Sequence, residues 1–86
     1  MTEKSQLIFK VLVFIRFQAE FLSGIIGWCQ KDPKVQQFST LTGEYDGIIE
    51  VELQTLPDLY LFYTRLDQLD GIQTVNSHIV MQEWNS

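Results

Sequence analysis

The sequence has very little of two residue types that often bind metals, with one cysteine, Cys29, and one histidine, His78. A lone cysteine cannot close a disulfide within the chain, and no recognised ligand spacing joins these two residues. Cys29 stands among Ile25, Ile26 and Trp28, which favours a small buried apolar side chain over a reactive thiol. We therefore expect no metal site and no cofactor.

Positive charge is also scarce. The chain has 6 Lys and Arg against 11 Asp and Glu, a net charge of -5, and a sequence pI near 4.5. A protein that binds the phosphate backbone of a nucleic acid needs a basic patch or stripe to displace counterions. The sequence shows no such stripe, so we expect no direct contact with DNA or RNA.

Long apolar runs are missing as well, since a membrane-spanning helix takes about 20 apolar residues. The N-terminal apolar stretch, residues 7–17, is shorter and is interrupted by Lys10 and Arg16. No small-residue cleavage pattern of a signal peptide follows it. The sequence predicts a cytoplasmic protein with no membrane partner.

Apolar residues are nevertheless abundant for a small chain. Of 86 residues, 45% are hydrophobic and 13% aromatic. A chain of this length makes one domain, covering residues 1–86, and buries only about 60–65% of its unfolded surface. The surplus predicts apolar surface on the folded monomer, which self-association would cover.

The first half of the chain reads as strand, helix, strand. Residues 8–17 carry apolar side chains on both faces, which indicates a central strand. A helix of about a dozen residues follows from Glu20, and we expect Gly24 and Gly27 to allow it to pack closely on the sheet. Asp32 and Pro33 end that helix, because the residue before a proline avoids helical angles. The second strand covers residues 35–41.

The second half reads as strand, helix, strand. In residues 47–54 apolar and polar side chains alternate, so one face meets the core. Thr55 is the predicted N-cap of the second helix, which ends at Asp70 and Gly71. The last strand covers residues 72–84, and the ordered core therefore spans about residues 8–84.

This order of elements predicts an α+β protein with the ferredoxin-like βαββαβ fold, a four-stranded antiparallel sheet with both helices on one face. The other face carries apolar residues mixed with glutamates and needs a partner. Two such sheets packed face to face would form a dimeric α+β barrel.

The loop between the second and third predicted strands has a composition suited to binding. Thr42, Gly43, Glu44, Tyr45 and Asp46 combine a hydroxyl, two carboxylates and a phenol with flexible backbone. Gly43 supplies the positive φ of a tight reversal, and Asp46 is able to accept hydrogen bonds from nearby backbone amides. Exposed N–H groups suit the carboxylate of a small zwitterion, and acidic side chains suit its ammonium. An ordinary hairpin connection is the alternative.

No catalytic constellation is found in the sequence. Glu50 and Glu52 share one strand face, but a solvated or interface-facing acidic row explains them better than a catalytic pair. His78 alternates with apolar residues on the last strand, which allows a proton shuttle but favours a half-buried, hydrogen-bonded histidine. We therefore expect a protein that is not an enzyme.

Several stretches resemble the effector domain of the leucine-responsive regulatory protein/AsnC family. Residues 42–51 are similar to its valine-threonine-glycine-x-tyrosine-aspartate stretch, residues 32–35 to its proline-x-valine entry to the second strand, and residues 71–72 and 79–81 to marks of its final strand. The resemblance covers about residues 8–82.

This resemblance implies a regulation-of-amino-acid-metabolism (RAM) domain, an amino-acid-sensing domain that modulates transcription or metabolism through ligand-dependent assembly. It implies a homodimer formed through the sheets, a higher oligomer such as an octamer or ring of dimers, and an amino acid effector at the dimer–dimer interface. The residues that match the family's ligand contacts are Thr42, Gly43, Tyr45, Asp46 and Ser77.

Three further residues complete the candidate site. Glu44 lies inside the loop, and His78 lies on the last strand beside Ser77. Val75 takes the first hydroxyl position of that strand, where this sequence departs from the family and lacks the donor.

The resemblance begins at the sensor's first strand, without the helix-turn-helix domain of full-length regulators. It therefore implies a stand-alone effector domain that is able to form mixed assemblies with a DNA-binding relative. Two alternatives remain: a small dimeric α+β barrel enzyme of the monooxygenase or isomerase type, using His78, and a structural adaptor without a ligand.

Overall fold

A computed structural model describes residues 8–84. Strand β1 is followed by a short 3-10 helix, Ala19–Phe21, and the chain then continues through helix α1, strands β2 and β3, helix α2 and strand β4. The elements span Phe9–Phe17 (β1), Leu22–Lys31 (α1), Val35–Thr40 (β2), Gly47–Leu53 (β3), Leu56–Asp67 (α2) and Ile72–Ile79 (β4).

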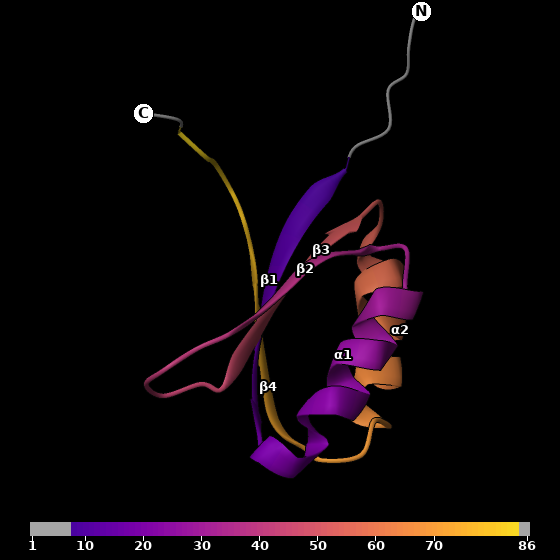
Figure 1. The fold of residues 1–86 in the computed structure, drawn as a ribbon. Coiled ribbons are helices and arrows are strands. Elements are labelled where there is room, and N and C mark those ends of the chain that lie inside the picture. Colours follow the sequence, from indigo (N-terminus) through magenta and orange to yellow (C-terminus); the bar gives the residue numbers. More distant parts are fainter. Residues whose placement is uncertain (1–7, 85–86) are drawn as a thin grey trace, which may run out of the picture.

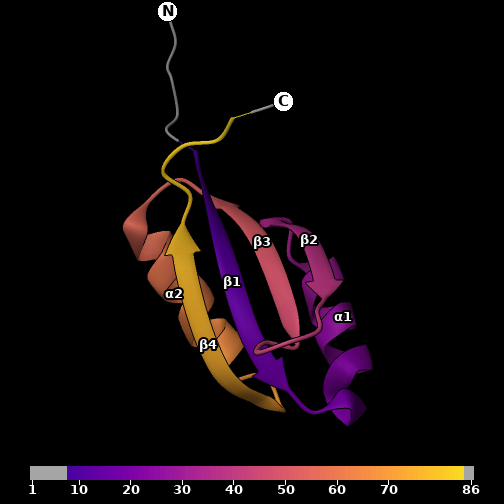
Figure 2. The same ribbon diagram turned by 90° about the vertical axis from the view of Figure 1, so that its left-hand side faces the viewer.

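The strands form one sheet in the order β2-β3-β1-β4, and all neighbours are antiparallel. Both helices cover the same face of this sheet, and no helix or strand within residues 8–84 covers the opposite face (Figures 1 and 2). The predicted ferredoxin-like βαββαβ fold of the α+β class is confirmed.

The core lies between the sheet and the helices. Alternate residues of β1 and β3 point toward the helices, and Val13 lies opposite Ile49 with both side chains fully buried. Phe62 of α2 is fully buried as well, and its ring centre lies 5.5 Å from that of Trp28 of α1. Each such side chain contributes about 1.5–3 kcal/mol through burial. The buried set is Val11, Val13, Ile15, Phe17, Ile25, Cys29, Ile49, Val51, Leu53, Phe62 and Leu66.

Cys29 belongs to this core, as predicted. Its side chain is only 5% exposed. Loss of solvation, and to a smaller degree the negative charge of Asp32, raise the pKa of its thiol to about 11. The thiol therefore stays protonated at neutral pH, where it is a poor nucleophile.

The predicted end of α1 and start of α2 are confirmed, but α2 ends at Asp67, with Gln68 as its C-cap, and does not reach the predicted end at Asp70 and Gly71. Helix α1 stops at Lys31 because Asp32 has extended backbone angles before Pro33, and the Asp32 carboxylate accepts a hydrogen bond from the Lys34 N–H at 2.9 Å. Thr55 caps α2, since its side-chain oxygen accepts a hydrogen bond from the Asp58 N–H at 3.1 Å.

The expected role of Gly24 and Gly27 is wrong. Nothing lies within 4 Å of the place where a Cβ would stand at either residue. The buried residues of α1 are Ile25 and Cys29, so these form its sheet-facing side. Gly24 and Gly27 are therefore turned away from the sheet, and a side chain there would meet open space.

The last strand is shorter than predicted, because it ends at Ile79 and not near Trp84. The Val80 N–H still donates to the Lys10 carbonyl at 2.9 Å, but no strand is assigned after it. In the segment beyond, Glu83 contacts the Lys10 ammonium at 2.8 Å, while Met81 and Trp84 are 87% and 82% exposed.

The sheet face opposite the helices, called the open face below, combines apolar and charged side chains. Leu12, Phe14 and Ile48 alternate along β1 and β3 with the buried core residues, so they point to this face, and each is only half-buried. No described element covers them. Within residues 8–84, neither helix has the length and apolar character needed to cross a membrane.

Candidate functional site

The predicted binding loop, residues 42–46, connects β2 and β3 and projects away from the helices (Figure 1). Gly43 has φ +108°, the left-handed region that favours glycine. The loop is closed by a hydrogen bond of 2.9 Å from the Leu41 N–H to the Asp46 carbonyl. Thr42, Gly43 and Glu44 at its tip are exposed and make no hydrogen bond with another described residue. Their polar groups therefore face solvent.

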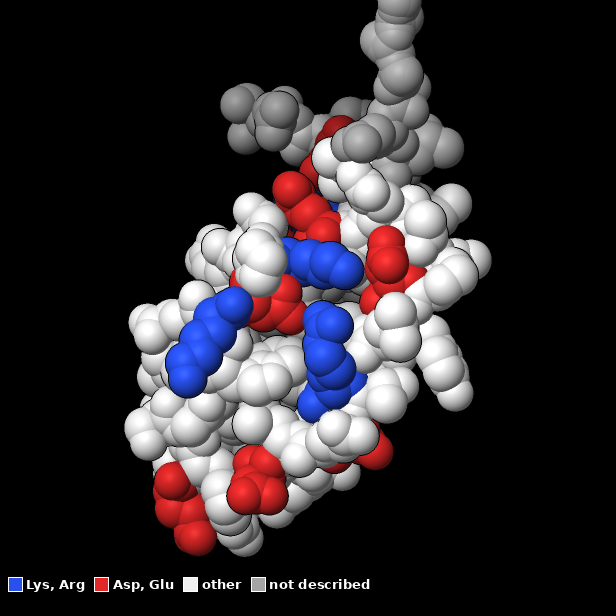
Figure 3. All heavy atoms as spheres, turned by 90° about the vertical axis from the view of Figure 1, so that its right-hand side faces the viewer, with Lys and Arg blue, Asp and Glu red and all other residues white. Residues whose placement is uncertain are grey.

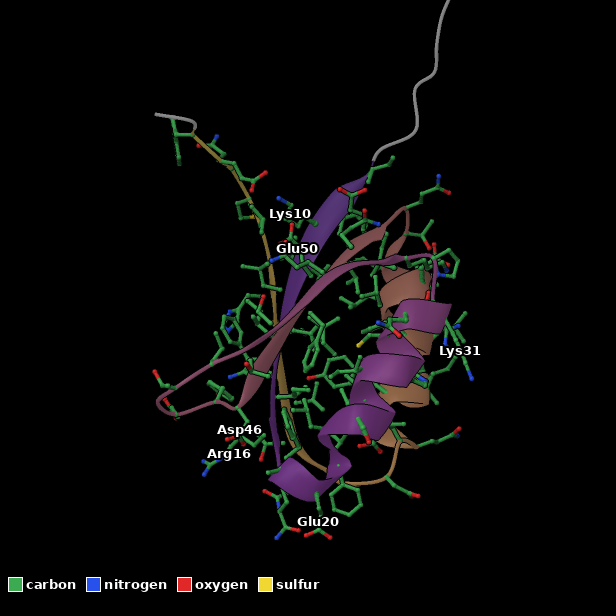
Figure 4. The ribbon with its side chains drawn as sticks, in the orientation of Figure 1. Lys10, Arg16, Glu20, Lys31, Asp46 and Glu50 are labelled. Carbon is green, nitrogen blue, oxygen red and sulfur yellow. The ribbon has the colours of Figure 1, made fainter. Side chains whose placement is uncertain are left out.

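Asp46 fastens this loop to the end of β1 (Figure 4). Its N–H donates to the Ile15 carbonyl at 2.9 Å, and its carboxylate oxygen Oδ2 accepts from the Phe17 N–H at 2.9 Å. The register between β1 and β4 shifts at Arg16 and Phe17, where the carboxylate supplies an acceptor. The predicted bond from Asp46 to a backbone amide is confirmed, and it occupies one of the two carboxylate oxygens.

Replacement of Asp46 by alanine is expected to lower the free energy of unfolding by about 1–3 kcal/mol, because the partly buried Phe17 N–H loses its acceptor. Urea denaturation measures this loss. The matched control is Glu44→Ala in the same loop, whose exposed carboxylate makes no such bond and whose removal should change stability by less than about 0.5 kcal/mol. Equal stability of the two variants would contradict the anchoring role.

Tyr45 joins the loop to the open face. Its ring centre lies 5.4 Å from that of Phe14 on β1, and its hydroxyl accepts a hydrogen bond from Asn76 Nδ2 on β4 at 2.9 Å. His78 also packs against Phe14, edge-on with ring centres 5.8 Å apart. The sequence reasoning missed Phe14 and Asn76, although the alternation along both strands places them on the open face.

Ser77 and Val75 lie on the other side of the sheet. They stand opposite Val13 and Ile15 of β1, whose side chains are fully buried beneath the helices, so they face the helix side. The Tyr63 hydroxyl of α2 donates to the Val75 carbonyl at 3.0 Å. A single chain therefore brings Tyr45 and His78 together around Phe14 but does not bring Ser77 to the loop.

A charged group occupies the upper part of the open face, where Figure 4 shows Lys10 close to Glu50. The Lys10 ammonium lies 2.8 Å from Glu83 and 3.1 Å from Glu50. Hydrogen bonds to Glu83 and then Glu50 raise the pKa of Lys10 above its usual value. Glu50 is thus an ion-pair partner. In the described part of the chain, no group of three or more histidine, cysteine or acidic side chains is arranged to hold a metal ion.

Comparisons with known proteins agree with this fold. The family model of the Lrp/AsnC ligand binding domain matches residues 10–86. Among solved structures, FFRP-DM1 is 26% identical with a TM-score of 0.78, over 85% of this chain and 99% of that one. The hypothetical protein PHS023 from Pyrococcus horikoshii is also 26% identical, with a TM-score of 0.77 over 90% of this chain and 93% of that one. No curated protein matches the sequence.

A longer regulator has the same fold. The transcriptional regulator NMB0573 from Neisseria meningitidis, solved as a complex with L-Met, is 18% identical with a TM-score of 0.84. The match covers 91% of this chain but 53% of the regulator, so this chain spans about half of that protein's length. The predicted class, a ligand-sensing regulatory domain, is supported by the match to the family model. With the family model covering nearly the whole sequence, the chain belongs to the Lrp/AsnC ligand binding domain family.

Proposed function

We propose that this chain senses a free amino acid, which it binds at a boundary between subunits, and that binding shifts the equilibrium between assembly states. The family supports a ligand-binding role. The Neisseria regulator of the same fold was solved with L-Met, an example of the ligand class that the proposal assigns to this chain.

The observation that carries this proposal is the anchored loop. Asp46 and Tyr45 attach the loop to the sheet, while Thr42, Gly43 and Glu44 remain exposed at its tip. Backbone N–H groups near Gly43 suit an amino acid carboxylate, and the Glu44 carboxylate suits its ammonium. A loop held in place loses less conformational freedom on binding than a free one.

The placement of Ser77 supports a site made by more than one chain. The Tyr45 side chain and Ser77 lie on opposite faces of the sheet. If one ligand contacts both the loop and a Ser77 side chain, the loop and that serine must belong to different subunits. The ligand would then stabilise the assembly that completes its site, which is a population shift.

The open face is the proposed dimer contact. Its half-buried apolar residues Leu12, Phe14 and Ile48 lie on the side of the sheet that the helices leave uncovered. Packing two such faces together would bury these residues and form the dimeric α+β barrel. Dimers would associate further into an octamer or a similar ring, and mixed assembly with a DNA-binding relative would carry the signal to DNA.

A thermal-shift screen of the protein against each proteinogenic amino acid, paired with multi-angle light scattering, tests the proposal. We expect one or a few amino acids to raise the melting temperature and to change the oligomer distribution. Calorimetry then gives the affinity and the stoichiometry per chain. A protein that stays monomeric and binds none of them would contradict the proposal.

Replacement of Glu44 by glutamine is expected to weaken amino acid binding about tenfold or more, because a charge-assisted contact with the ligand ammonium contributes about 1.5–3 kcal/mol. Stability should not change, since Glu44 is exposed and makes no hydrogen bond with the described residues. Calorimetry measures the affinity. The control Glu20→Gln removes the same charge from the exposed 3-10 helix, away from the loop and the open face, and should bind like the parent. Unchanged affinity in the Glu44 variant would remove this residue from the site.

A further inference from the structure

The protein is acidic overall, but basic side chains gather on its helix-covered side (Figure 3). Residues 8–84 contain five Lys and Arg, and Lys31, Lys34 and Arg65 line one hollow of about 380 Å³. The same hollow is lined by Trp28, Asp32 and Pro33. It lies between the end of α1 and α2, on the side opposite the open face, so it is separate from the binding loop of residues 42–46.

The cationic groups of this hollow are partly fixed in position. The Asp32 carboxylate accepts from the Arg65 guanidinium at 3.0 Å and, with its other oxygen, from the Lys34 N–H at 2.9 Å. A guanidinium has five N–H donors, so this ion pair leaves several for a ligand. The Trp28 ring is held against the buried Phe62. Such preorganisation lowers the entropic cost of binding.

Structural roles explain only part of this cluster. The Arg65–Asp32 ion pair connects the two helices, and Lys34 lies 4.0 Å from Asp58. Exposed pairs of this kind contribute about 0–1 kcal/mol, which is little. Lys31 has no ion pair or hydrogen bond with another described residue. A lysine in the last turn of a helix does interact favourably with the helix dipole, but that interaction requires neither Arg65 nor Trp28 beside it.

The same dipole limits what the hollow binds. The carbonyl end of α1 lies here and disfavours a bare anion. A ligand that also places a flat ring against Trp28 gains stacking and apolar contact, and base–aromatic stacking alone is worth about 1–3 kcal/mol. We propose that the hollow lined by Trp28, Lys31 and Arg65 is a second ligand site, which binds a small anionic metabolite whose carboxylate or phosphate is joined to a flat ring.

The proposal is tested by NMR titration of the ¹⁵N-labelled protein, following the indole N–H of Trp28, which a Trp84→Phe variant distinguishes from that of Trp84. The probes are benzoate, AMP and inorganic phosphate. We expect saturable shifts at Trp28 with at least one ring-bearing anion, which identifies carboxylate or phosphate as the preferred group. Inorganic phosphate should bind about tenfold more weakly, because it has no ring to stack.

Lys31→Glu should weaken binding of the ring-bearing anion at least tenfold without unfolding the protein, since Lys31 is exposed. Arg16→Glu is the control: Arg16 is also exposed, so the variant makes the same change of net charge at the far end of β1, and its affinity should stay within twofold of the parent, about what screened charge alone explains. Glu44→Gln should leave binding at this hollow unchanged. Failure of this proposal can therefore be told apart from failure of the proposed amino acid site at the loop. The proposal is overturned by absence of Trp28 shifts with both ring-bearing probes, by equal binding of bare phosphate, or by equal losses in the two charge variants.

Discussion

Replacement of Gly71 by alanine is expected to lower the free energy of unfolding by about 2–5 kcal/mol, which is enough to unfold a large part of a small domain. Gly71 has φ +93°, where a residue with a Cβ is strained by about 1–2 kcal/mol. A Cβ at this position would also stand 2.6 Å from the Cβ of Phe21 and closer still to its ring, which adds about 1–3 kcal/mol of overpacking.

The matched control for this prediction is Gly43→Ala. Gly43 has a similar φ of +108°, but nothing lies within 4 Å of its missing Cβ. The Gly43→Ala variant should therefore lose only about 1–2 kcal/mol of stability, which is the cost of the added backbone strain. Urea denaturation of both variants, each compared with the parent, separates strain from steric overlap. Equal losses at the two positions would show that Phe21 moves aside without cost.

Replacement of Leu12 by lysine is expected to convert the proposed dimer into a monomer, raising its dissociation constant at least 100-fold, because removing an added charge from water at an interface costs several kcal/mol. Leu12 is half-buried on the open face, opposite Glu50 on β3 and His78 on β4. In the free chain the new ammonium would still reach water, so the fold should survive. Light scattering over a concentration series measures the mass, and circular dichroism monitors the fold.

Leu61→Lys is the control for the interface. Leu61 is 55% exposed on α2, on the helix-covered side of the molecule. The variant makes the same chemical change away from the open face and should keep the mass of the parent. If Leu12→Lys also keeps it, the open face is not the dimer contact.

Local signals in the sequence predicted the fold well, because each acts within a few residues. The alternation in β3 set its buried face, Thr55 capped α2, and Asp32 before Pro33 ended α1. The predicted packing of Gly24 and Gly27 on the sheet was wrong, because the side of a helix that meets the sheet is set by the apolar side chains that become buried. Ile25 and Cys29 set that side here, and the glycines fell outside it.

The candidate site was predictable in composition but not in contacts. The sequence indicated that Asp46 would bond to a backbone amide, but which amide depends on how the end of β1 meets the loop. The bond between Tyr45 and Asn76 joins residues from distant parts of the sequence, and only the strand order brings them together. The placement of Ser77 on the helix side likewise follows from the register of β4 with β1.

The double attachment of the β2–β3 connection limits how the protein can be re-engineered. Transplanting residues 42–46 alone into a related scaffold would carry Tyr45 and Asp46 without their hydrogen-bond partners. A graft that includes Asn76 and residues 14–17 of β1 would transfer the partners of both Tyr45 and Asp46. Substitutions are accordingly best tolerated at Thr42 and Glu44, which are exposed at the tip and can change without disturbing the contacts of Tyr45 and Asp46.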